Sequence, residues 1–440
     1  MKKFILPFIY YFVKGLTKLT FWGFYRHTTI LHPEHLKLDN GPYILVSNHP
    51  NTLIDPLQAA IGINRFVYFL ANAGLFKTPF TNWFFTTFYC IRIERPTDVK
   101  GRPLQNDIGF ALCDLHLNKG GVLYIAPEAY SYKGRKLMPL KTGTARIALS
   151  AERKQNFELG LKILPVGLNY SSPYDFRSDI LIHVGEPLLV SDFAADYKKD
   201  AFGAARLLTD QLEKRFGALM LTTQDGEEDE LLRQLEELLQ NDQPLSRTEQ
   251  HFRAQKILSG IQNFRKEQET EWLNRKIEMN SYFDEIKAAD LSDRDIARPG
   301  SCHLLRRSLL AFISLPFFIY GWVNNYLPAF VPAWTVRKLK QAEEYDATVK
   351  MLTGIITFPL FYFLQYKLVG QFFSSPYPLF YLLSLVPMGL LAWNLKEMYT
   401  RLQYSWRFQT YRREQPDGIR SIFQKRVALM EWVERMRNEE

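Results

Sequence analysis

Cysteine is scarce in this sequence, and the glycine-rich loops of nucleotide-binding proteins are absent. The 440 residues contain only Cys90, Cys113 and Cys302, and no two of them form a CxxC pair. This spacing excludes a disulfide framework and favours a reducing compartment. Because the sequence contains no GxGxxG or Walker-type loop, it predicts no nucleotide cofactor.

Excess charge of either sign is missing from the second part of the chain, whereas the first part is basic. Residues 1–190 contain 22 Lys and Arg against 13 Asp and Glu, and residues 191–440 contain 33 of each kind. The basic part should therefore attract a phosphate-bearing substrate, acidic lipid headgroups or nucleic acid. Since the aromatic residues lie in apolar runs and do not alternate with basic ones, we expect no nucleic acid partner.

Three long stretches almost lack charged residues. Residues 308–336 and 376–395 carry none, and residues 351–369 carry only Lys367. Each is close to or above the ~20 residues that cross a bilayer, so together they predict a membrane-embedded region at 301–395. The alternative is a buried helical core.

The first of these stretches is interrupted by polar and helix-breaking residues. It contains three prolines and the pair Asn324–Asn325. A straight helix fits this pattern poorly, because proline cannot donate a backbone hydrogen bond. The stretch is therefore predicted to be a kinked helix or a re-entrant hairpin that turns at the asparagine pair.

Basic residues flank the outer ends of the three stretches, whereas the connector 370–375 carries none. The positive-inside rule places such ends on the cytoplasmic side. The sequence therefore predicts an inner (cytoplasmic) membrane protein in which residues 26–218, the domain before these stretches, face the cytoplasm.

The N-terminus has a different pattern. Within residues 1–25, residues 4–25 are apolar and aromatic, with Lys14 and Lys18 on one helical stripe. This is typical of an amphipathic helix that lies in the membrane interface. A signal peptide is the alternative, but no small-x-small cleavage site follows the apolar run.

Between residues 26 and 218, short β-type runs alternate with helical stretches, which predicts an α/β domain. The β-type runs are 43–47, 66–71, 91–94, 122–126, 163–168 and 180–184, and the helical stretches are 56–62, 107–118, 141–151 and 196–218. The pattern of residues 219–300 predicts a charged helical region, either long surface helices or a short coiled segment. The pattern of residues 396–440 predicts a C-terminal amphipathic helix.

A histidine and a carboxylate follow the first β-type run. His49 lies just past residues 43–47, and Asp55 lies six positions further on. A carboxylate can hold one ring nitrogen and leave the other to take a proton from a hydroxyl, so the pair predicts a general base with its orienting group. Because Pro56 follows Asp55, a helix N-cap is a second role for this aspartate, compatible with the first.

Further polar blocks follow later strands and helix starts. In chain order they contain Arg95, then Glu128 and Ser131, then Lys141 and Gly143, and finally the Pro165–Val166 strand. In this order and spacing, residues 40–190 resemble the PlsC-type phospholipid/glycerol acyltransferase family. Its members carry an asparagine-histidine block with a downstream Asp, a block that ends in Arg, a Phe-Pro-Glu-Gly block, Lys-x-Gly and a Pro-Val strand.

The resemblance implies a mixed sheet flanked by helices and an O-acyltransferase of phospholipid biosynthesis. Such an enzyme moves a fatty acyl group from acyl-CoA or acyl-carrier protein, which is a co-substrate and not a cofactor, to a glycerol-phosphate-type acceptor. It also implies that His49 is the general base and that Asp55 holds the imidazole tautomer.

The remaining site residues are assigned by the same resemblance. Arg95 would hold the acceptor phosphate through its planar guanidinium, and Lys141, in one block with Gly143, would add a second cation at a helix start. Glu128 would bind an acceptor hydroxyl or lock the loop that carries Arg95, and Ser131 is a further candidate for substrate binding.

The sequence departs from the family pattern in ways that bear on the acceptor. Five residues separate His49 from Asp55, where the usual block has four, and Tyr89, Ala126 and Ala129 replace a glycine, a phenylalanine and a glycine. Glycerol 3-phosphate is slightly favoured over lysophosphatidate. A non-phosphate acceptor such as an amino-acid lipid, and a catalytically silent membrane scaffold, remain as alternatives.

No metal site is expected. His27, His32 and His35 lie close in sequence to Glu34, but Pro33 interrupts any regular ligand spacing.

Overall fold

The computed structural model describes residues 2–95, 98–99, 101–132, 134–299 and 304–438, so Cys302 lies outside the described residues. The chain divides into two compact units. The first contains Met1–Thr222 and Gln341–Thr348, and the second contains Thr223–Lys340 and Val349–Glu440. Each unit is described by itself.

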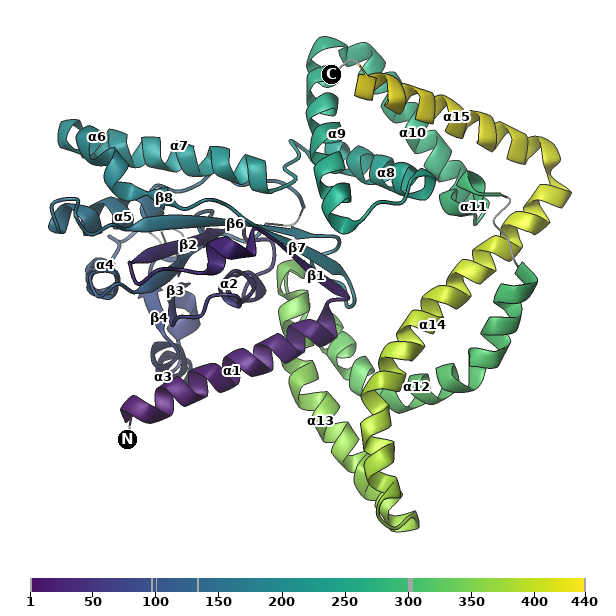
Figure 1. The fold of residues 1–440 in the computed structure, drawn as a ribbon, viewed down its shortest axis with the longest axis horizontal. Helices are drawn as coiled ribbons and strands as arrows, with labels where there is room; N and C mark the ends of the chain where they lie inside the picture. Colours follow the sequence, from purple (N-terminus) through teal and green to yellow (C-terminus); the bar gives the residue numbers. More distant parts are fainter. Residues whose placement is uncertain (1, 96–97, 100, 133, 300–303, 439–440) are drawn as a thin grey trace. The chain divides into compact units, whose positions relative to one another are not determined.

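A mixed eight-stranded sheet forms the centre of the first unit (Figure 1). Its order is β1-β7-β6-β2-β5-β3-β4, with β8 paired to β6. Strands β2 to β6 run parallel, whereas β7 and β8 pair antiparallel with β6. The strands are β1 (His27–Leu31), β2 (Tyr43–Ser47), β3 (Val67–Asn72), β4 (Cys90–Ile93), β5 (Val122–Ile125), β6 (Lys162–Tyr170), β7 (Asp179–Val184) and β8 (Leu188–Leu189).

Helices cover the sheet and follow its strands. They are α1 (Lys2–Phe24), α2 (Ile54–Ala60), α3 (Pro79–Thr87), α4 (Asp107–Leu117), α5 (Gly143–Lys154), α6 (Ala194–Lys199) and α7 (Ala201–Leu219). Buried apolar side chains of α4, α5 and α7 pack with those of β2, β5 and β6 in one core. All five residues of β2 are buried, which makes its carboxyl end a rigid base for whatever follows it.

The predicted mixed α/β fold is confirmed, and the six predicted strands correspond to β2 through β7. The sequence reading missed β1 and β8. β1 is an edge strand with no buried residue, so it shows no hydrophobic alternation to reveal it.

Helix α1 presents an apolar face to solvent, and of its two stripe lysines Lys14 contacts the domain whereas Lys18 is exposed. The Lys14 ammonium donates to the Ile63 carbonyl, and the Tyr10 ring packs on Phe66 at 4.9 Å between centroids. Large apolar side chains are exposed elsewhere on the helix, namely Phe8, Tyr11, Phe12, Val13, Leu19 and Trp22. An apolar face of this kind on a surface helix suits the membrane interface.

The second unit contains a helical bundle with a core of its own. Its helices are α8 (Gly226–Asp242), α9 (Arg247–Glu267), α10 (Glu269–Ala288), α11 (Asp293–Ala297) and α15 (Pro416–Asn438). Leucines of α8 pack with Trp272 and Trp432, so these charged helices are more than a solvated surface. The fully buried Asp293 accepts from Arg426 Nε at 2.9 Å and Tyr282 Oη at 2.5 Å, which satisfies its charge.

Three long helices of the second unit carry the apolar stretches. They are α12 (Leu304–Leu339), α13 (Asp346–Phe372) and α14 (Tyr377–Glu414), and all three are long and apolar enough to cross a membrane. The predicted helix boundary at residue 396 is wrong. The charged residues after 395 extend α14, and the break comes at Gln415, directly before Pro416.

Helix α12 runs unbroken through Asn324 and Asn325, so the kinked helix is found and no hairpin turn separates two helices there. Figure 1 draws α12 as a bent helix. Both asparagine side chains donate back to carbonyls four residues earlier, at 2.8 and 2.9 Å. Such side-chain insertion, together with the three internal prolines, accounts for the bend.

The two halves of α12 pair with different helices. Its first half runs antiparallel to α14, with Ser314 beside Tyr399 and Tyr320 beside Ser384. In its second half the Pro328 carbonyl accepts from Thr357 of α13, and Asn325 accepts from Tyr362. Helices α13 and α14 are joined by one short turn. The first half of α12 therefore runs along α14 toward that turn, and its second half runs along α13 away from it.

Candidate active site

The carboxyl end of β2 carries Asn48 and His49. The Asn48 amide bonds both backbone groups of Leu168 on β6, at 2.7 and 2.9 Å. This two-point contact fixes the backbone just before His49. The imidazole is 12% exposed, so it lies at the surface of the fold and is accessible to a substrate.

Asp55 orients the His49 ring. Its Oδ2 lies 3.1 Å from His49 Nδ1 and accepts from the Asn51 N–H at 2.5 Å, and its Oδ1 accepts from the Tyr170 hydroxyl at 2.7 Å. The carboxylate is fully buried. With Nδ1 facing a carboxylate, Nε2 is the nitrogen that can accept a proton.

The predicted N-cap role of Asp55 is wrong. α2 begins at Ile54 with Leu53 as its N-cap, so Asp55 lies inside the first turn of the helix. Its side chain bonds the preceding loop instead of capping α2. The position still presents the carboxylate toward the strand ends, because the helix start follows β2 after a short loop.

Glu128 supports the same loop from β5. Its Oε1 accepts from the backbone N–H of His49 at 2.8 Å, and its Oε2 accepts from the N–H of Met138 at 3.0 Å. Burial raises the pKa of this carboxyl to about 7 against the two hydrogen bonds, which lower it. Glu128 was predicted to bind an acceptor hydroxyl or to lock the loop that carries Arg95. Neither of its two contacts is with the Arg95 loop, and the loop that it holds carries His49.

Arg95 follows β4 directly after a residue that is held by several contacts. The neighbouring Glu94 is buried, forms a two-pronged ion pair with Arg102 at 2.7 and 3.0 Å, and exchanges backbone hydrogen bonds with the Asn106 side chain. The Arg95 guanidinium lies 5.1 Å from the centre of the Tyr130 ring. This cation–π contact leaves the guanidinium N–H groups in its plane available for an anion.

The turn at 127–130 joins the predicted site residues. Glu128 holds the His49 backbone, Tyr130 lies against Arg95, and the Pro127 carbonyl accepts from the Lys141 N–H at 2.9 Å. Lys141 is exposed just before α5, whose first residue is Gly143, and Ser131 is half-buried next to Tyr130. One turn thus contacts the backbone of His49, the guanidinium of Arg95 and the backbone of Lys141.

Two positions at which the resemblance leads us to expect glycine have a left-handed backbone in this chain. Ala129 has a φ of 67° and Tyr89 a φ of 63°, both in the left-handed region. This region costs a residue with a Cβ about 1–2 kcal/mol relative to glycine. The turn that organises the site therefore keeps the glycine-type geometry, with alanine in it.

Sequence reasoning assigned no role to Tyr170, Asn51 or Asn48. Tyr170 ends β6, which runs parallel to β2, so its position at the same sheet edge could be expected once the strand order is known. Strand order is a long-range property, and the sequence does not display it.

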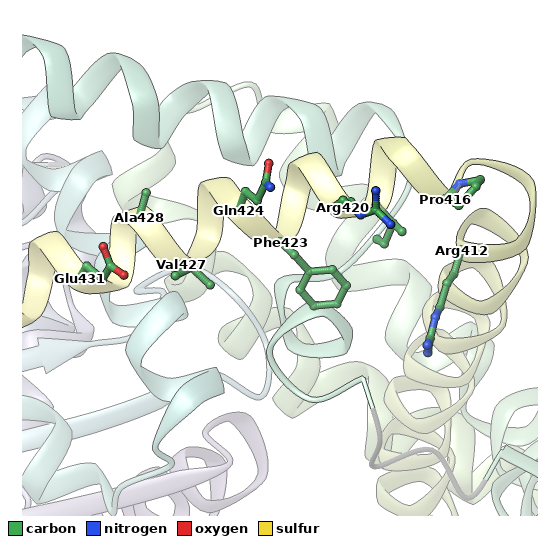
Figure 2. Close-up of a pocket in the computed structure, with 9 residues that line it drawn as sticks. Arg412, Pro416, Arg420, Phe423, Gln424, Val427, Ala428 and Glu431 are labelled. Atoms are coloured by element: carbon green, nitrogen blue, oxygen red, sulfur yellow. The ribbon is translucent and has the colours of Figure 1, made fainter.

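The histidines near the N-terminus have ordinary partners. His27 Nδ1 lies 2.8 Å from Asp179, and His32 Nδ1 lies 3.1 Å from Glu34. Within the ranges that the structure describes, no three metal-ligating side chains come together. A separate open groove lies in the second unit along α15, between Arg412 and Glu431 (Figure 2), and contains none of the predicted site residues.

Comparisons with known proteins identify the domain that carries this site. Residues 27–169 match the family model described as Acyltransferase. Glycerol-3-phosphate O-acyltransferase 1 of Saccharomyces cerevisiae is 31% identical over 26% of this chain and 15% of its own length. An uncharacterized acyltransferase of Schizosaccharomyces pombe is 36% identical over 19% of this chain and 12% of its own length. The chain thus matches less than a sixth of either relative.

A solved structure, the 1-acyl-sn-glycerophosphate acyltransferase PlsC of Thermotoga maritima, is also similar. It has a TM-score of 0.33 and 18% identity, and the match covers 48% of this chain and 80% of that chain. Residues 27–169, with the histidine–aspartate pair after the central strand, are thus similar to the family described as Acyltransferase. It stands in a chain with three apolar helices long enough to span a membrane.

Proposed function

We propose that this protein is a membrane-bound O-acyltransferase that moves a fatty acyl group from acyl-CoA or acyl-carrier protein to a hydroxyl of a glycerol-phosphate-type acceptor. The observation that carries the proposal is the His49–Asp55 pair at the end of β2, beside a turn that also contacts Arg95 and Lys141. A base and two cations at one turn suit an acceptor that bears both a hydroxyl and a phosphate.

His49 acts as the general base in this proposal. Nε2 removes the acceptor hydroxyl proton while the oxygen attacks the thioester carbonyl carbon. The carbon–sulfur bond of the tetrahedral intermediate then breaks, and the imidazolium returns its proton to the departing thiolate. Asp55, held by His49, Asn51 and Tyr170, stabilises the imidazolium while it exists.

Direct attack by the acceptor fits the described cysteines better than an acyl-enzyme. Burial raises the pKa of both Cys90 and Cys113 to about 12. A thiol with such a pKa is almost entirely protonated near neutral pH and is a poor nucleophile.

Arg95 and Lys141 bind the acceptor phosphate. The guanidinium can form two parallel hydrogen bonds to phosphate oxygens, and the ammonium adds charge beside the start of α5. Glycerol 3-phosphate is the favoured acceptor. The long His49–Asp55 spacer supports it, as does the similarity to glycerol-3-phosphate O-acyltransferase 1 of Saccharomyces cerevisiae.

The apolar segments attach the enzyme to the membrane, where an acylated product would be incorporated. The exposed apolar face of α1 and the helices α12 to α14 support attachment to the membrane, and the basic flanks of the apolar stretches support a cytoplasmic catalytic domain. We assign the protein to the inner (cytoplasmic) membrane and to phospholipid biosynthesis.

Thiol release from the donor tests the function. Purified protein in nanodiscs is supplied with palmitoyl-CoA or palmitoyl-acyl-carrier protein and, in separate reactions, with glycerol 3-phosphate, lysophosphatidate or a lipid acceptor without phosphate. The proposal requires thiol release that depends on a phosphate-bearing acceptor and an acylated product of matching mass. Thiol release that occurs only with the phosphate-free acceptor, or that needs no acceptor at all, would contradict the proposed function.

A further inference from the structure

The chain between α12 and α13 lies against the loop that carries the catalytic pair. Residues 341–348, here the connecting segment, include the first turn of α13 and belong to the first unit, whereas α12 and the rest of α13 belong to the second. Ala347 is fully buried and Thr348 is 6% exposed. A polar connector between two apolar helices has no reason of its own to be buried, so its contacts are specific.

Thr52, midway between His49 and Asp55, makes those contacts. Its Oγ1 donates to the Glu344 carbonyl at 3.1 Å and lies 2.9 Å from the Thr348 hydroxyl. Since a hydroxyl has one proton, Thr348 is then the donor of the second bond. Thr52 itself is 9% exposed, so both bonds are shielded from water.

The backbone of Thr52 needs such support. Its φ is 25°, in a region that a β-branched residue rarely adopts. Conformations of this kind cost of order 1–3 kcal/mol and persist only where surrounding contacts fix them. Thr52 also lies within the five-residue spacer of this chain, which is one residue longer than the usual block. The longer spacer and the strained backbone of Thr52 thus lie where the connecting segment packs.

We propose that the connecting segment, through Thr348 and Thr52, positions the loop that carries the His49–Asp55 pair. The proposal rests on the proposed function for its catalytic consequence, but not for the contact itself. Thr348 and Thr52 are positioning residues, since neither touches the reacting atoms.

Replacing Thr348 by valine removes the hydroxyl and keeps the branched shape of the side chain. Thr348→Val should lower kcat about five- to tenfold, the usual worth of one shielded hydrogen bond, with donor and acceptor KM changed by less than about twofold. Thr348→Ser, which keeps the hydroxyl, should restore kcat. Thr353→Val is the matched control, because the Thr353 hydroxyl bonds only carbonyls of its own helix, those of Val349 and Lys350.

Hydrogen–deuterium exchange in nanodiscs tests the contact without any substrate. In Thr348→Val, peptides that cover residues 48–55 should exchange faster than in the wild type, whereas peptides from β6 should not change. Thr353→Val should leave both unchanged. Unaltered exchange at 48–55 in a folded Thr348→Val protein would overturn the proposal, whichever acceptor the enzyme uses.

A double-mutant cycle on kcat tests the Thr52–Thr348 contact independently. Because Thr348 and Thr52 act through one bond, the Thr52→Val and Thr348→Val effects on kcat should be less than multiplicative in the double variant. Fully multiplicative effects would show that the two side chains act separately and would contradict the proposal. If the wild type acylates no acceptor, the proposed function fails, while the exchange result still decides the positioning role.

Discussion

The Tyr170 hydroxyl donates to Asp55 Oδ1 at 2.7 Å, on the carboxylate oxygen that His49 does not contact. It reaches Asp55 from the end of β6, and so it ties the orienting carboxylate to the sheet. Removing this hydroxyl should let the carboxylate rotate away from the imidazole. The contact is therefore a test of how rigidly the base must be held.

Tyr170→Phe should lower kcat by about three- to tenfold and leave both KM values nearly unchanged, since one buried hydrogen bond is lost and no substrate contact is altered. Steady-state thiol release measures both parameters. Tyr43→Phe is the control, because Tyr43 is a buried tyrosine at the opposite end of β2. Equal losses in the two variants would mean that Tyr170 supports packing alone.

Arg95→Ala and Lys141→Ala should each raise the acceptor KM by about 10- to 100-fold, because a charge-assisted hydrogen bond is worth roughly 1.5–3 kcal/mol. The donor KM should change little. Arg153→Ala, which removes an exposed cation from the last turn of α5, is the control. If the acceptor KM in both test variants equals that of the control, the phosphate binds elsewhere or the acceptor has none.

Glu128 should make stability depend on pH. Its pKa is raised from 4.5 to about 7 in the folded protein. Between these values the folded state binds more protons than the unfolded state, so the stabilisation by Glu128 is fully present below about pH 4.5 and is lost as the pH rises through about 7.

The comparison with Glu128→Gln isolates this effect. The unfolding midpoint of the wild type, minus that of the variant, should fall as the pH is raised from about 5 to 8. Thermal unfolding in nanodiscs followed by intrinsic fluorescence measures it. The exposed Glu158→Gln variant should show a constant difference. A pH-independent difference for Glu128→Gln would contradict the raised pKa.

The path of α12 predicts a topology. Because its halves pair antiparallel with α14 and α13 in turn, both of its ends should lie on the cytoplasmic side, as should the C-terminus. Single cysteines at Phe372, Ala342 and Ala428, in a variant without the native cysteines, can be labelled in spheroplasts with an impermeant thiol reagent. We expect labelling at 372 only. Labelling at 342 or 428 would show that α12 crosses the membrane once.

Local sequence patterns predicted the strands well because buried parallel strands are short apolar runs between polar turns. The run at 43–47 corresponds to β2 without a change of boundary. Boundaries failed where charge was taken for a helix end, as at residue 396, since charged residues do not interrupt a helix and Pro416 does. β1 was missed because an exposed edge strand has no apolar pattern.

The site was predicted by residue type but not by contact. The sequence indicated His49 and Asp55. Because they are only six residues apart, the chain can bring their side chains within 3.1 Å through local structure alone. The contacts of Asp55 with Tyr170 and of Thr52 with Thr348 join residues 115 and 296 positions apart. No local pattern encodes such pairs, because they depend on strand order and on where the connecting segment packs.

The turnover of His49→Ala tests the central claim most directly. Purified in nanodiscs and assayed by thiol release with glycerol 3-phosphate, it should lose about 10²- to 10⁴-fold in kcat, the usual contribution of a general base. Its membrane association and unfolding midpoint should match those of the wild type. Activity within a few-fold of the wild type, in a variant that is folded and membrane-bound, would remove His49 from the mechanism and contradict the account.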